Sequence, residues 1–245
     1  MLEWKDNLNI LNLYATKDII LSCAETGQLV TFSAPSLRDL ISNFQLNICV
    51  GFLKKTYTEL QKAFEIWEPR NFYDIFVILI TKAGVYREYI ELKTNVWEGF
   101  KVLFKKHELT CTENDIYIDD VFLDEGLFNV IIYLLKKLNG ESVQPPVIAK
   151  TPEEQAFLDE MNKMNEKIAR IKGQNKSAKE DDLLKIFATI CYIFPMMTFD
   201  YLLDQTMYQI SWLQKYASKG VNYSIEEKAF AAGNMKKKLK FFLEK

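Results

Sequence analysis

The hydrophobic and polar positions of residues 195–220 predict one helix that is apolar on two opposed sides. Tyr201, Tyr208 and Trp212 fall on one side, at about 100° per residue. The other side carries an aliphatic and aromatic stripe: Phe199, Leu202, Leu203, Ile210, Leu213 and Ala217. Thr198 is a candidate N-cap, and Gly220 is a candidate stop. A helix with two apolar sides must be covered on both, by the protein's own core or by another molecule.

Residues 1–143 alternate between strand-like and helix-like patterns. A β-hairpin is predicted over 18–32, with Gly27 in its turn, and a smaller one over 115–123, turning at Asp119 and Asp120. Helices are predicted after Ser36 and, further along the chain, over 51–68, 71–83, 85–106 and 125–138. Periodicity does not separate helix from strand over 71–83, where we favour helix.

Residues 144–176 are predicted to form a linker with one amphipathic helix. Thr151 and Glu154 form a capping box at its start, and the apolar seam that follows is Phe157, Met161, Met164, Ile168 and Ile171. Residues 177–245 are predicted to form a helical domain, with one helix ending before Pro195 and another starting at a Ser224–Glu227 capping box. The predicted fold class is mainly α (α+β): a small N-terminal domain of helices with one or two β-hairpins, a linker helix and a C-terminal helical domain.

Composition narrows the classes of function. The net charge of −2 over 245 residues gives no global basic field, so nucleic acid is not an expected partner. No uncharged apolar run approaches the about 20 residues that cross a bilayer, and charged residues interrupt the start of the chain, so we expect a cytoplasmic protein with no membrane partner. Four widely spaced cysteines suggest buried free thiols in a reducing compartment: Cys23, Cys49, Cys111 and Cys191.

The sequence carries little catalytic equipment. Its one histidine, His107, is expected at a solvent-exposed helix end, and the chain has no HExxH, GxSxG or glycine-rich phosphate loop. The acidic residues of 113–125 lack the order of a calcium loop and are explained by two turns and a helix cap. The lysines of 236–240 are expected on a solvated helix end. We therefore predict no metal, no cofactor and no enzyme, with a small carboxylate enzyme as the remaining catalytic alternative.

Tyr201, Tyr208 and Trp212, with Met207 beside them, are the candidate partner-binding residues. Large aromatic side chains anchor many protein interfaces. The competing interpretation is that these rings pack in the protein's own core. Both interpretations fit the sequence.

The C-terminal region resembles that of tail assembly chaperone-like proteins of phages infecting Gram-positive bacteria. The resemblance lies in the aromatic-proline ending YIFP, the helix MTFDYLLDQTMYQISWL, and VNYSIEEKAFAAGN before a lysine-rich end with KFF. The segment ENDIYIDDVFLDEGLFNVIIYLL also has the hairpin-then-helix order of such proteins. Residues 1–110 take no part in it.

This resemblance implies a non-enzymatic role in phage morphogenesis. Such chaperones bind the long tape measure protein in the cytoplasm of the bacterial host, keep it soluble and yield it to the polymerising tail tube protein. Aromatic and methionine side chains suit an apolar helical client, since they adapt to varied surfaces. The alternative is a structural virion subunit of the neck, tail or baseplate, and self-association is a further expectation.

Overall fold

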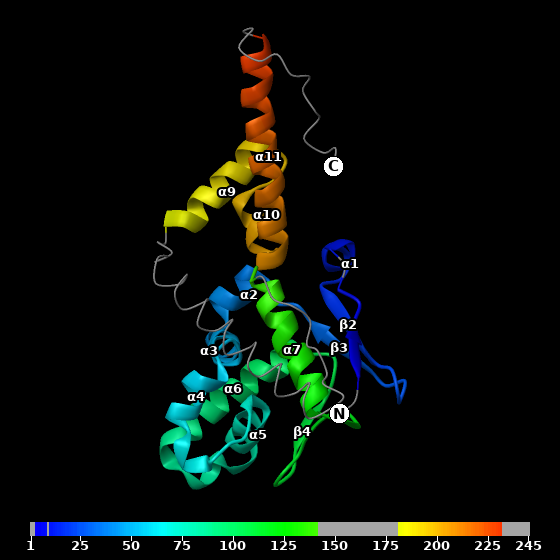
Figure 1. The fold of residues 1–245 in the computed structure, drawn as a ribbon, viewed down its shortest axis with the longest axis vertical. Coiled ribbons are helices and arrows are strands. Elements are labelled where there is room, and N and C mark those ends of the chain that lie inside the picture. The colour runs from blue at the N-terminus through cyan, green and yellow to red at the C-terminus, as the bar shows by residue number, and fades with distance from the viewer. Residues whose placement is uncertain (1–2, 9, 142–180, 232–245) are drawn as a thin grey trace, which may run out of the picture. The chain divides into compact units, whose positions relative to one another are not determined.

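A computed structural model describes residues 3–8, 10–141 and 181–231 (Figure 1). The chain divides into two compact units: Met1–Pro145 with Asp200–Trp212, and Pro146–Phe199 with Leu213–Lys245. The described residues are mainly helical with two three-stranded antiparallel sheets, so the predicted α+β class is confirmed. The structure groups residues 200–212 with the N-terminal unit, whereas the sequence placed them in a C-terminal domain. The predicted linker helix lies outside the described residues.

The first sheet contains the predicted hairpin and one strand that the sequence did not predict. Strands β2 (Asp18–Cys23) and β3 (Leu29–Ser33) pair antiparallel, and Gly27 takes a φ of 69° in the turn between them. The missed strand β1 (Trp4–Asp6) pairs with the other edge of β2. Alternate residues of β2 are buried, so one face of the sheet belongs to the core and the other carries Ile20 and its cross-strand partner Thr31.

The helices that follow the first sheet begin at side-chain caps. They are α2 (Leu37–Ser42), α3 (Phe44–Leu53) and α4 (Tyr57–Ala63). A further short helix, α1 (Ile10–Ala15), lies between β1 and β2. Ser36 and Asp39 form a capping box on α2, and Thr56 and Glu59 form another on α4. The single helical run predicted over 51–68 is therefore wrong, because Thr56 starts a new helix.

The solidly apolar segment is helical. It forms α5 (Phe72–Lys82), which Asn71 caps, and this confirms the choice of helix over strand. Short 3-10 turns surround it: η1 (Glu65–Trp67), η2 (Ala83–Val85) and η3 (Arg87–Tyr89). Helix α6 (Ile90–Leu103) then starts later than the predicted residue 85.

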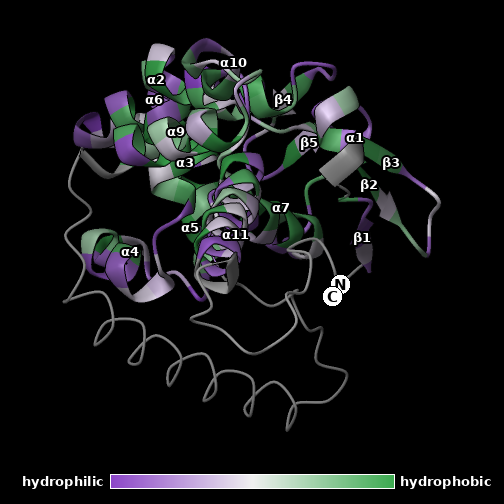
Figure 2. Ribbon diagram, turned by 90° about the horizontal axis from the view of Figure 1, so that it is seen from above, coloured by the Kyte–Doolittle hydropathy of each residue, from purple (hydrophilic) through white to green (hydrophobic). Residues whose placement is uncertain are grey.

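The second sheet and the helix after it match the sequence closely. Strands β5 (Ile116–Ile118) and β6 (Val121–Phe122) form the predicted small hairpin, and the missed strand β4 (Leu109–Cys111) pairs with β5. Helix α7 (Glu125–Leu138) has the predicted bounds. Asp124 caps its start, and Gly140 takes a φ of 77° just past its end. Most of α7 is hydrophobic, as its green ribbon in Figure 2 shows, and ten of its residues are buried.

The core of the first unit is rich in aromatic rings. Phe76 contacts both Phe100 and Phe128 with ring centroids 5.0 Å apart, and Phe104 lies edge-on to Phe32 at 5.7 Å. All five rings are fully buried. Such pairs stabilise a core beyond the area they bury, typically by about 0.5–1.5 kcal/mol each.

The helix predicted over 195–220 is interrupted in the structure. Helix α10 (Phe199–Leu203) ends early, and α11 (Met207–Ala231) begins after a break at residues 204–206. A new capping box causes the restart: Gln209 N–H donates to Thr206 Oγ1 at 3.2 Å, and Thr206 N–H donates to Gln209 Oε1 at 2.7 Å. Because α11 continues past Gly220 and Ser224, the predicted stop and the predicted new start there are both wrong.

The described part of the second unit consists of α9 (Asp181–Ile193), the residues up to Phe199 and α11 from Leu213 onward. Phe187 and Ile190 are buried on one side of α9. Phe187 also contacts Phe199 edge-on at 5.6 Å. Gly220 lies against Ile193, since an added Cβ would be 3.4 Å from Ile193 Cγ2.

Candidate protein-binding surface

The one histidine is not on a solvent-exposed helix end, which corrects the prediction for His107. Its side chain is 15% exposed and lies between the two sheets of the first unit. Nε2 accepts the backbone N–H of Thr31 at 2.8 Å, and Nδ1 is 2.6 Å from Asp119 Oδ2. Because Nε2 acts as an acceptor, Nδ1 carries the proton and donates to Asp119. Both ring nitrogens are therefore engaged, and neither is available as a general base in this arrangement.

A pocket of about 340 Å³ lies over the outer face of the first sheet. Its polar lining includes Asn7, Asp18 and Lys106. Asp18 accepts from Ser33 Oγ at 3.0 Å and from Lys106 Nζ at 2.5 Å, and Asn7 Oδ1 accepts the N–H of Ile20 at 2.7 Å. These polar atoms therefore serve the hydrogen bonds of the sheet itself. Among the described residues, no cluster of His, Cys, Asp and Glu has the arrangement of a metal site.

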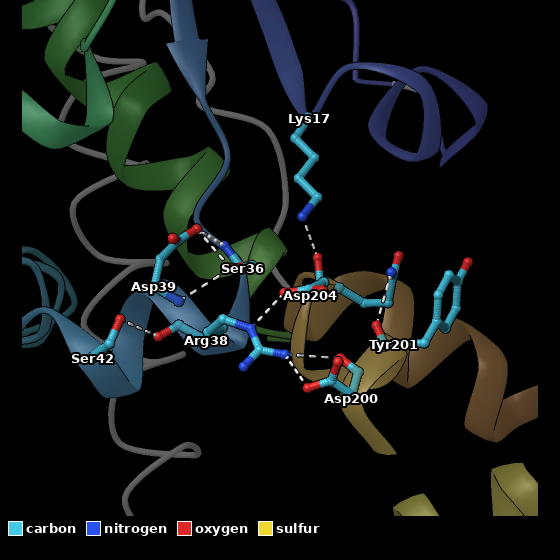
Figure 3. A network of polar contacts seen from close by, with 9 residues as sticks. Lys17, Ser36, Arg38, Asp39, Ser42, Asp200, Tyr201 and Asp204 are labelled. Atoms are coloured by element: carbon cyan, nitrogen blue, oxygen red, sulfur yellow. Dashed lines mark hydrogen bonds and ion pairs between the residues drawn. The ribbon is translucent and has the colours of Figure 1, made fainter. Parts of the chain in front are cut away.

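Residues 200–206 are held on the first unit by Arg38 (Figure 3). Arg38 Nη2 lies 2.6 Å from Asp200 Oδ1, and Arg38 Nε lies 2.6 Å from Asp204 Oδ1. Asp200 and Asp204 are four residues apart, so one guanidinium meets both carboxylates. The hydrogen bond from Arg38 lowers the pKa of Asp204, and the same contacts raise the pKa of Arg38.

Backbone contacts fix the same segment. The N–H of Leu37 donates to the carbonyl of Gln205 at 2.8 Å, and Lys17 Nζ donates to the carbonyl of Asp204. Gln205 and Thr206 are buried polar residues. The start of α11 is thus anchored to Lys17, just before β2, and to Leu37, the first residue of α2.

The predicted partner-binding residues fall into two groups. Tyr201 and Trp212 are 41% and 37% exposed, whereas Tyr208 is half-buried and packs against the core of the first unit. Met207 is also half-buried. Figure 3 shows the Tyr201 ring on the opposite side of its segment from Arg38. Since the break at 204–206 separates Tyr201 from α11, the predicted single face of three rings is reduced to Tyr208 and Trp212, four residues apart.

Tyr201 lies near α1. Burial raises the pKa of Tyr14 to about 12, and the electrostatic effect of Tyr201 adds to this rise. Tyr201 is thus an exposed ring on the anchored segment 200–206.

The second unit carries an exposed apolar stripe that sequence reasoning missed. Leu184, Ala188 and Tyr192 follow one another at intervals of four residues on α9, and all three are exposed, Leu184 by 61% and Tyr192 by 81%. Met196, three residues after the end of the helix, is also exposed. The signal was present in the sequence, because an i, i+4, i+8 apolar series opposite an apolar face marks a two-sided helix.

Two more exposed apolar side chains, Ile41 and Phe44, lie at the junction of α2 and α3. Exposed single apolar residues are common on protein surfaces. These two large side chains are each about two-thirds exposed, at 66% and 68%.

Comparison with known proteins gives no relative for this chain. No protein-family model matches it, and neither the curated proteins nor the solved structures include a significant match. Within the described part of the chain, no helix is both long and apolar enough to cross a membrane.

Proposed function

We propose that this protein is a non-enzymatic phage morphogenesis protein, a tail assembly chaperone that binds the tape measure protein and keeps it soluble before the tail tube polymerises. It acts in the cytoplasm of the bacterial host and needs no cofactor. The client-binding residues are Tyr201, Tyr208, Trp212 and Met207, of which Tyr201 and Trp212 are exposed and the other two are half-buried.

The observation that carries this proposal is the exposure of two large aromatic rings, Tyr201 on the anchored segment and Trp212 on α11. Aromatic side chains that are held in place lose little conformational entropy on binding, and such residues dominate the energetics of protein interfaces. The contacts of Arg38 with Asp200 and Asp204 hold the segment that carries Tyr201. A partner that covers Tyr201 therefore meets a ring whose backbone segment is already held in place.

The exposed stripe of α9 supports a helical client. An amphipathic helix is recognised through apolar side chains at intervals of three or four residues, and Leu184, Ala188 and Tyr192 offer a matching series. A tape measure protein with long apolar helical seams has the chemistry to meet this stripe. Met196 adds a flexible, polarisable side chain that adapts to varied apolar partners.

The hydrogen bonds of His107 favour binding over catalysis. Nucleophilic catalysis by serine or cysteine commonly uses a histidine with one free ring nitrogen as the base. Here both nitrogens of the chain's one histidine form hydrogen bonds within the fold.

Co-expression tests the proposal. A candidate tape measure protein, the long coiled-coil protein expected from a neighbouring gene, should be soluble when this chain is present and insoluble when it is absent. Leu184→Ser combined with Tyr192→Ser should lower the soluble fraction, and Phe122→Ser, which changes an exposed aromatic residue of the second sheet, should not.

Mass spectrometry of purified particles separates the chaperone from a structural subunit. A chaperone leaves before the tail is complete, so its peptides should be missing from mature particles. A fixed copy number in the particles would contradict the proposal and favour a neck, tail or baseplate subunit.

A further inference from the structure

His107 connects the two sheets of the first unit through one hydrogen bond that it accepts and one that it donates. Towards β3 its Nε2 accepts the N–H of Thr31, and towards the β5–β6 turn its Nδ1–H donates to Asp119. The first contact requires an unprotonated Nε2. The second survives protonation and becomes stronger, because an imidazolium beside a carboxylate is an ion pair.

The contact with Thr31 lies on the outer edge of β3. Thr31 is opposite Ile20 of β2, and its N–H points away from β2 to reach the imidazole. An unpaired N–H on a sheet edge offers a hydrogen bond to another strand, and proteins commonly cover such positions. His107 provides that cover here.

Asp119 is held independently of the imidazole. Its Oδ1 accepts the N–H of Glu108 at 2.7 Å, and its own N–H donates to the Glu108 carbonyl at 2.7 Å. Asp119 takes a φ of 52°, in the left-handed region where Asp is enriched. The hydrogen bond from His107 lowers the pKa of Asp119, so this carboxylate remains charged in mildly acidic solution.

Other charged groups also lie near the ring. Lys106, the neighbour of His107, pairs with Asp18 of β2, and Glu108 and Asp120 are exposed to solvent. The ion pair between Lys106 and Asp18 ties the segment after α6 to the first sheet by a route that does not use His107. Loss of the Thr31 contact is therefore a local event.

We propose that His107 is a protonation-dependent latch between the two sheets of the first unit. The neutral ring joins β3 to the β5–β6 turn. The protonated ring stays with Asp119 and leaves Thr31, because two N–H donors then face each other across 2.8 Å. The N–H on the edge of β3 becomes free at acid pH, and the turn keeps its structure.

Amide hydrogen exchange measured by NMR on the full chain tests the latch. Between about pH 7.5 and about pH 5, the interval in which histidine side chains usually change charge, the protection factor of Thr31 should fall by about tenfold, the factor that corresponds to one hydrogen bond. The protection factor of the Glu108 amide should stay constant. In His107→Gln, whose carbonyl oxygen can accept from Thr31 without titrating, neither protection factor should change over this interval.

Two results would overturn the latch. One is a Thr31 protection factor that is the same at both pH values. The other is a fall that includes Glu108 and occurs in His107→Gln as well, because it would mean general acid unfolding.

The nitrogen chemical shifts of the imidazole give a second readout on the unmodified protein. His107 is the only histidine in the sequence, so the histidine signals report this ring alone. At neutral pH they should show the proton on Nδ1, and a proton on Nε2 would contradict the latch even if His107→Gln fails to fold.

Discussion

Gly99→Ala should destabilise the first unit, because α6 and α3 approach each other closely at Gly99. A Cβ added there would lie 2.4 Å from the carbonyl oxygen of Gln45 and 2.4 Å from Cβ of Cys49. Both atoms belong to α3, and one is backbone, so the clash can be relieved only by moving a helix. Overpacking of this kind costs about 1–3 kcal/mol, and we expect the upper end. Alanine has the higher helix propensity, and this difference stabilises the variant by about 1 kcal/mol. The free energy of unfolding of Gly99→Ala should therefore be about 2 kcal/mol lower than that of the wild type.

Gly51→Ala is the matched control. Gly51 lies in α3, is exposed, and has nothing within 4 Å of an added Cβ. This variant should be about 0.5–1 kcal/mol more stable than the wild type, since only helix propensity changes. Urea unfolding followed by circular dichroism measures both, with the midpoint shifting and the slope unchanged. A Gly99→Ala protein as stable as the wild type would refute the close approach of the two helices.

Three further predictions concern caps, thiols and the anchored segment. Asp124→Ala should lower the free energy of unfolding by about 1–2 kcal/mol in the same assay, because Asp124 Oδ1 accepts the N–H of Leu127 at the start of α7 and also accepts from Trp4 Nε1. An unchanged urea midpoint would contradict this prediction. A maleimide should label Cys111 rapidly in the native protein and Cys49 only after unfolding, because Cys111 is exposed whereas burial raises the pKa of the Cys49 thiol. Mass spectrometry measures the two labelling rates, and equal rates in the native protein would contradict this prediction. The hydrogen bond from Arg38 lowers the pKa of Asp204, so the contribution of this carboxylate to stability is present above the pKa of an unfolded Asp and is lost as the pH falls through the lowered folded pKa. At neutral pH the contact is therefore present, and chymotrypsin should cleave near Tyr201 faster in Arg38→Ala than in the wild type. Lys101→Ala, which removes a surface ion pair elsewhere, is the control and should be cleaved as the wild type is.

Local signals in the sequence predicted much of the fold. Ser36, Asp124 and Gly27 each act through residues two to four positions away, and the structure places all three as predicted. Strands β1 and β4 were missed because each has only three residues, too few for a visible alternation. They form because a neighbouring strand offers hydrogen bonds, and this information is not local.

The break before α11 was visible in principle. Thr206 and Gln209 have the spacing of a capping box, yet the apolar stripe that runs across them favoured one continuous helix. The Ser224–Glu227 box has the same pattern and lies within continuous helix, so the motif alone does not fix a boundary.

The contacts that shape the candidate site could not be read from the sequence. Arg38 meets carboxylates more than 160 residues away, and His107 meets Thr31 across 76 residues. One sequence does not show which distant residues become neighbours. The exposure of Tyr201 and Trp212 likewise depends on how the whole first unit packs.

The affinity for a candidate tape measure protein tests the central claim most directly. Tyr201→Ser combined with Trp212→Ser should weaken binding by at least about tenfold, since aromatic anchors typically contribute more than about 1 kcal/mol each, and the circular dichroism spectrum should not change. Phe122→Ser, which alters a ring of the same 41% exposure as Tyr201, should bind as the wild type does. Wild-type affinity in the folded double variant would contradict the claim that these two rings hold the client.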